Sequence, residues 1–76
     1  MTLDILPIGK NAKICSVGGE GALRLRMLDM GLIPGTEVSV RKTAPLGDPL
    51  EISVRGYKLT MRKDDARLIK IREEGT

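Results

Sequence analysis

The side chains that could hold a metal ion or carry a reaction are few in this sequence of 76 residues. It has one cysteine and no histidine, which excludes imidazole-ligated zinc sites, serine-type catalytic triads and internal disulfides. The remaining candidate ligands are Cys15, Asp48, Asp64, Asp65, Glu73 and Glu74. No spacing among them resembles a transition-metal site, and no nucleophile has a base to activate it. We therefore expect no enzyme activity and no cofactor, and the metal ligands, if any, stay unknown.

Three of these candidates have simpler expected roles. Cys15 lies in an apolar run that predicts a strand, where a cysteine is most often a small buried side chain. Asp64 and Asp65 lie at the start of a predicted helical turn, where carboxylates commonly accept hydrogen bonds from the first free N–H groups. These residues are thus expected to stabilise the fold.

Anion binding has little support either. The glycine-rich segment 18–21 precedes a predicted helix, but no Lys-Ser/Thr pair follows it and Glu20 occupies the place of an anion. Basic side chains on the predicted strands could form a basic face: Arg41, Lys42, Arg55, Lys58 and Arg62. Tyr57 is the single aromatic residue, however, and proteins that bind single strands stack bases on several rings. We expect no nucleic-acid partner.

Charge and hydropathy indicate the compartment. The formal net charge is +3, with basic residues interspersed among acidic ones along the whole chain. No apolar stretch reaches 18 residues, and the first ten residues lack the pattern of a signal peptide. With a single cysteine, disulfides do not hold the fold together. We expect a soluble protein of the reducing cytoplasm.

The elements that must position these residues are short, and we expect one domain over residues 1–76. Apolar residues alternate with polar ones at 37–41, 50–55 and 58–62, which predicts three half-buried strands. Further strands are predicted at 12–17 and 68–72, a helix at 22–30 and one helical turn at 63–67. This order predicts a mainly β fold with one or two short helices: a small SH3-like β-barrel with an inserted helix.

Two loops have residues that fix their backbone. A glycine ends the predicted helix in a left-handed conformation, and the Pro-Gly pair that follows reverses the chain. The second loop, 44–49, is wide and is stiffened by two prolines. The residues expected to define the two loops are Gly31, Pro34, Gly35, Pro45, Gly47, Asp48 and Pro49.

The predicted helix carries two apolar stripes, and the second loop carries a leucine. One stripe consists of Leu23, Met27 and Met30, and the opposite one of Leu25, Leu28 and Leu32. Either both stripes are partly buried, or one is an open patch that receives another protein. Leu46 likewise either folds back on the barrel or is displayed. The residues alone leave both alternatives open.

Four segments carry a resemblance to a known family. The segments LDMGLIPGT (28–36), APLGDP (44–49), RGYKLTMR (55–62) and DARLI (65–69) resemble, in order and spacing, the FeoA family of ferrous-iron transport accessory proteins. The resemblance implies a cytoplasmic SH3-like domain that regulates FeoB, the membrane iron transporter with an N-terminal G-protein domain. Membrane association would be indirect, through the transporter, and weak self-association stays open.

The alternative function is a metal-responsive module that binds a transition metal directly, because the same fold resembles the C-terminal domain of iron-dependent repressors. For the leading function we predict an apolar partner-binding surface with a basic rim. Its residues are Leu25, Met27, Met30 and Leu46, with Arg26, Arg41 and Arg62 at the rim.

Overall fold

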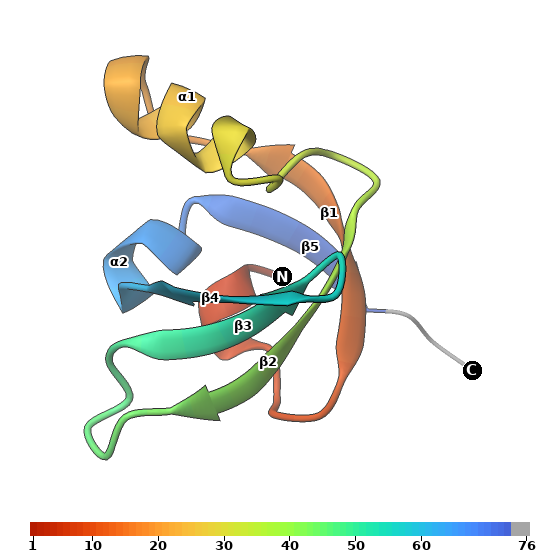
Figure 1. Ribbon diagram of the computed structural model, residues 1–76, viewed down its shortest axis with the longest axis vertical. Helices are drawn as coiled ribbons and strands as arrows, with labels where there is room; N and C mark the ends of the chain where they lie inside the picture. The colour runs from red at the N-terminus through yellow and green to blue at the C-terminus, as the bar shows by residue number, and fades with distance from the viewer. Residues whose placement is uncertain (74–76) are drawn as a thin grey trace.

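Residues 1–73, the part of the chain that the computed structural model describes, form one antiparallel sheet with short helices around it (Figure 1). The predicted domain end at 76 and the candidate ligand Glu74 lie outside these residues. Along the chain the elements are η1 (Leu3–Ile5), β1 (Asn11–Val17), α1 (Gly21–Asp29), β2 (Glu37–Thr43), β3 (Leu50–Val54), β4 (Tyr57–Met61), α2 (Lys63–Ala66) and β5 (Ile69–Glu73). The mainly β fold and its two short helices follow the prediction.

The order of the strands is β4-β3-β2-β1-β5, so β4 and β5 are the two edges of a curled sheet. The curled sheet agrees with the predicted small barrel, but it does not close completely, because these two edges do not pair. One reason is that α2 occupies the short connection between them. The other is that β5 already has neighbours: Thr2 forms a bridge with Lys70, and the N–H of Ile71 donates to the carbonyl of Met1.

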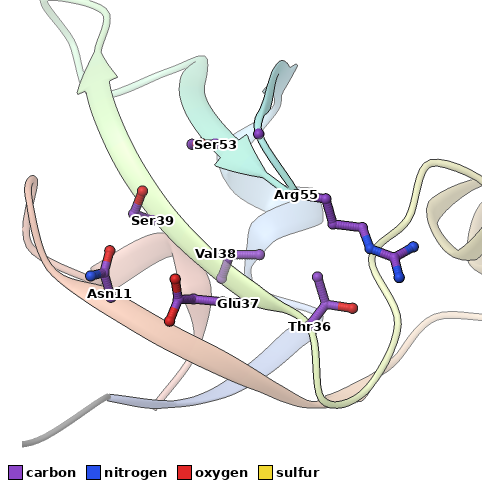
Figure 2. Close-up of a pocket in the computed structure, with 8 residues that line it drawn as sticks. Asn11, Thr36, Glu37, Val38, Ser39, Ser53 and Arg55 are labelled. Carbon is purple, nitrogen blue, oxygen red and sulfur yellow. The ribbon is translucent and has the colours of Figure 1, made fainter.

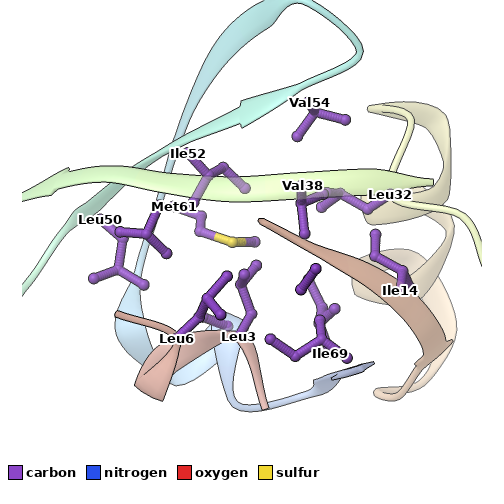
Figure 3. Packing of buried hydrophobic residues seen from close by; sticks show 14 of the residues in the cluster. Leu3, Leu6, Ile14, Leu32, Val38, Leu50, Ile52, Val54, Met61 and Ile69 are labelled. Atoms are coloured by element: carbon purple, nitrogen blue, oxygen red, sulfur yellow. The ribbon is translucent and has the colours of Figure 1, made fainter. Parts of the chain in front are cut away.

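The hydrophobic core lies inside the curve of the sheet (Figure 3). Paired strands supply it in register, with Val38 opposite Val54 and Val40 opposite Ile52. This is the alternation that the sequence predicted, since every second side chain of a strand points to the same face. Leu3, the first residue of η1, and Leu6, the residue after its end, close the core from below, a contribution that the sequence did not reveal.

The end of α1 has the geometry that its glycine predicts. Gly31 adopts φ +95°, its N–H donates to the carbonyl of Leu28 (3.0 Å), and the N–H of Leu32 donates to Met27 (3.1 Å). These two bonds form a Schellman motif, in which a residue of positive φ satisfies the last carbonyls of the helix. Leu32 makes the apolar contact that accompanies the motif and is fully buried.

The prediction that the Cys15 side chain, in β1, is buried is wrong. It is exposed and forms no disulfide. The pairing of β1 with β5 shifts between Ile14 and Ser16, so Cys15 is the extra residue of a β-bulge. Ala12 and Ile14 face the core, so the in-out alternation of the strand already turns Cys15 to solvent. The bulge leaves Ser16 exposed as well and returns Val17 to the core.

Candidate partner-binding surface

A groove of about 300 Å³ lies between α1, the end of β4 and α2. Its lining residues are Leu23, Arg26, Met27, Met30, Thr60, Met61, Arg62 and Asp65. Four of these, Arg26, Met27, Met30 and Arg62, belong to the predicted surface. The fold thus brings the end of β4 beside a helix that precedes it by some 30 residues in the chain.

Both apolar stripes of α1 are partly buried, so most of the helix follows the first alternative, in which neither stripe is a fully open patch. Met27 is 1% exposed and packs in the core, so its prediction as a partner-facing residue is wrong. The reason is its position: Met27 belongs to the hydrophobic core, and Leu23 and Met30 pack against that core half-buried. Leu25 stays 61% exposed and is available to a partner.

The loop between β2 and β3 displays its leucine. Leu46 is 95% exposed, so the fold-back alternative is wrong. The loop is nevertheless closed by backbone hydrogen bonds from Gly47 to Ala44 (2.7 Å) and from Ala44 to Pro49 (3.0 Å). Gly47 has φ +84°, and the peptide bond before Pro49 is cis. An internally bonded turn therefore holds Leu46 in solvent.

Asp48 joins this loop to the groove. Its Oδ1 accepts a hydrogen bond from the backbone N–H of Lys63 at 2.9 Å, and Lys63 is the first residue of α2. The first N–H groups of a helix have no partner inside the helix, so the carboxylate satisfies one of them. The predicted cap by Asp64 or Asp65 is wrong, because Asp64 accepts a hydrogen bond from the Arg67 guanidinium instead.

The exposed leucine and the groove lie on one side of the molecule. In Figure 1, α1, α2 and the loop after β2 follow one another along the left side. Arg26 and Arg62 are exposed at the groove. Arg41 does not join them: it lines a separate depression with Ile8 and Gly9, and its Nε lies 3.9 Å from Oε2 of Glu51. Arg41 therefore does not line the groove.

Thr60 is a surface residue that sequence reasoning missed. It lines the groove and also a second depression, of about 350 Å³, beside Pro45 and Pro49. Thr60 thus connects the groove with the base of the Leu46 loop. The sequence pattern predicted that Thr60 points outward from a strand. Its nearness to α1 depends on the tertiary packing of the helix, which the pattern does not give.

A third depression, of about 340 Å³, is lined mostly by polar residues of β1, β2, β3 and the turn after β3, and holds none of the predicted site residues (Figure 2). Figure 2 shows the guanidinium of Arg55 pointing away from the carboxylate of Glu37, so the two charges do not converge on a common point. Within residues 1–73, no three Cys, Asp or Glu side chains come together as metal ligands.

A curled antiparallel sheet of five strands with a helix inserted between β1 and β2 is an SH3-like fold. Residues 1–73 match the family model for the FeoA domain, and the chain therefore belongs to the FeoA family. It is 37% identical over 71 residues to a Porphyromonas gingivalis protein, the Fe(2+) transport protein A/Fe(2+) transporter FeoB fusion protein. The match spans 93% of this chain and 8% of that protein.

Solved structures of FeoA proteins have the same fold. The solution structure of FeoA from Chlorobium tepidum is 40% identical with a TM-score of 0.92, over 99% of this chain and 71% of that one. Zinc-complexed FeoA from Stenotrophomonas maltophilia, described as a procaryotic SH3 domain protein, is 28% identical with a TM-score of 0.83, over 93% and 88%. IdeR from T. acidophilum shares the fold alone, at 20% identity and TM-score 0.84 over 97% of this chain and 34% of IdeR.

Proposed function

We propose that this protein is a regulatory accessory protein of ferrous-iron uptake that binds the cytoplasmic part of an FeoB-type transporter. The observation that supports the proposal is the P. gingivalis relative, in which an FeoA part and FeoB are one polypeptide. Covalent linkage keeps two parts at a high effective concentration, which benefits parts that work in contact. The role is one of binding, and it requires no catalytic group on this chain.

The surface proposed for this contact consists of the groove, Leu25 and Leu46. Leu46 stands out as an apolar anchor, and Arg26 and Arg62 supply positive charge beside the groove. Interfaces commonly depend on a few such anchors, with polar residues around them. Small interfaces of this kind are typical of weak, transient complexes, and the contact we propose is of that class.

The proposed location follows from the partner. No helix formed by residues 1–73 has the length and apolar character needed to span a bilayer. Under this proposal the protein stays in the cytoplasm and reaches the membrane through the transporter. A direct metal-sensing role is the competing hypothesis, and the same experiment tests it.

The experiment is an amide-resolved titration of the labelled protein with the soluble G domain of the transporter. We expect shifts at residues 23–30, 44–49 and 60–63, where the groove and the loop lie. Shifts confined to the exposed side of β1 and β5, or no shift at all, would overturn the proposed contact. A parallel series with Fe(II) under anaerobic conditions tests the alternative: saturable shifts around Cys15 or the carboxylates would favour a metal sensor.

A further inference from the structure

The two edges of the sheet differ in whether another segment covers them. At the β5 edge, Met1 and Thr2 run alongside and pair with Ile71 and Lys70. The β4 edge has no pairing segment among residues 1–73. An unpaired edge presents a row of free N–H and C=O groups that can pair with another strand.

The register of the β3–β4 hairpin shows which groups these are. Val54 lies opposite Tyr57 across the two-residue turn Arg55–Gly56, both of whose residues have positive φ. In such a hairpin the flanking pair is hydrogen-bonded, and bonded pairs then alternate along the ladder. The backbone groups of Lys58 and Thr60 therefore point away from β3. Within residues 1–73, the outward backbone groups of these two residues form no hydrogen bond with another segment.

From this edge we infer that β4 accepts an extended strand of alternating acidic and apolar residues, supplied by the partner protein. Main-chain bonds to Lys58 and Thr60 would hold it, in the manner of strand addition to a sheet edge. The inference rests on the proposed function only for the identity of the partner, because the edge and its chemistry are features of this chain.

The charge along the edge selects an acidic strand. From Arg55 to Arg62 the sequence has Arg55, Lys58 and Arg62 and no Asp or Glu. A second copy of this chain pairing by its own β4 would align these cations along one seam, which like-charge repulsion opposes. Carboxylates on the outward side of an added strand would instead lie beside Lys58.

The inward side of the added strand meets an apolar space. Leu59 and Met61 point to the inner face of β4, and Leu59 is half-buried at the edge. The groove between β4 and α1 opens beside Thr60 and Met61, at the end of β4, with Leu23 and Met30 on its far wall. Side chains that alternate with the acidic ones would point into this groove, so apolar residues fit these positions.

A capped octapeptide of alternating glutamate and valine tests the inference without the transporter. We expect saturable shifts of the Lys58 and Thr60 amides, and no binding of the corresponding lysine–valine peptide. The Thr60→Pro variant lacks the outward N–H but keeps the bonds to β3, whereas Thr60→Val keeps both. We expect Thr60→Pro to bind about tenfold more weakly than Thr60→Val.

Four results would overturn the inference: equal affinity of the two Thr60 variants, equal binding of both peptides, no saturation up to about 5 mM peptide, or concentration-dependent pairing of the protein through β4. If Thr60→Pro does not fold, Lys58→Glu replaces it. We expect this variant to bind the glutamate–valine peptide about fivefold more weakly at low salt. Unchanged affinity would also overturn the inference. Peptide binding without G-domain binding would leave the inference standing and refute the proposed partner.

Discussion

The Oδ1 atom of Asp48 lies 2.9 Å from the backbone nitrogen of Lys63 and accepts its hydrogen bond. This contact joins residues 15 positions apart and connects two parts of the candidate surface. The loop of Asp48 displays Leu46, whereas the helix of Lys63 contributes Asp65 to the groove. The side chain of Asp48 thus links the loop to the first turn of α2, because it accepts a hydrogen bond from the first N–H of that helix.

Replacing Asp48 by alanine should lower the free energy of unfolding by about 1 kcal/mol, because the first N–H of α2 loses its acceptor. Urea unfolding measures this difference. Asp64→Ala is the matched control. It removes a carboxylate within α2 that pairs with the exposed guanidinium of Arg67, and exposed ion pairs contribute little to stability. Equal losses for the two variants would show that the cap contributes nothing.

Replacing Gly31 by alanine should destabilise the protein by about 1–2 kcal/mol. The residue has φ +95°, and an added Cβ would lie 3.1 Å from the Tyr57 hydroxyl oxygen. Gly9→Ala is the control, with φ +88° and no atom within 4 Å of the added Cβ, so it measures the backbone strain alone. Adding Tyr57→Phe should bring the Gly31→Ala loss toward the Gly9→Ala value; a double variant with no recovery would contradict the proposed close contact.

The strands and turns could be predicted from the sequence because their signals are local. The alternation around Val38–Val40 fixes which side chains face the core, and Gly31 and Gly35 have the positive φ that the turns require. The inward-facing residues of β1 were harder to identify, because Ile14 and Val17 are both buried although they lie three positions apart. The bulge between them depends on how β1 pairs with β5, more than 50 residues later, and Cys15 lies on the outward side.

The candidate surface was predicted in part, for a similar reason. The amphipathic pattern of α1 places Met27 and Leu25 on different sides, but it does not say which side the sheet covers. Asp48 was identified as a loop residue, while its hydrogen bond to Lys63 follows from the tertiary arrangement. Thr60 had no distinguishing signal, because an exposed threonine in a strand is common.

Met27 and Leu25 allow a direct test of how α1 lies on the sheet. Met27→Ala should lower the free energy of unfolding by about 2–4 kcal/mol, since it removes a core side chain and leaves a cavity. Leu25→Ala should change it by less than about 0.5 kcal/mol, because Leu25 is largely in solvent. Both changes leave a good helix former, so helix propensity does not explain the difference. The reverse order of effects would mean that the helix buries its other side.

Leu46→Glu should separate binding from stability. The side chain is displayed on a turn with its own backbone bonds, so the melting temperature should stay within about 2 °C of the wild type. Affinity for the transporter's G domain should fall at least about tenfold, because an apolar anchor is replaced by a charge that must be desolvated. Ile8→Glu makes the same charge change at an exposed isoleucine outside the groove and the loop, and should bind normally. Calorimetric titration of both variants decides the matter: equal weakening would attribute the effect to net charge, and unchanged binding by Leu46→Glu would remove Leu46 from the contact.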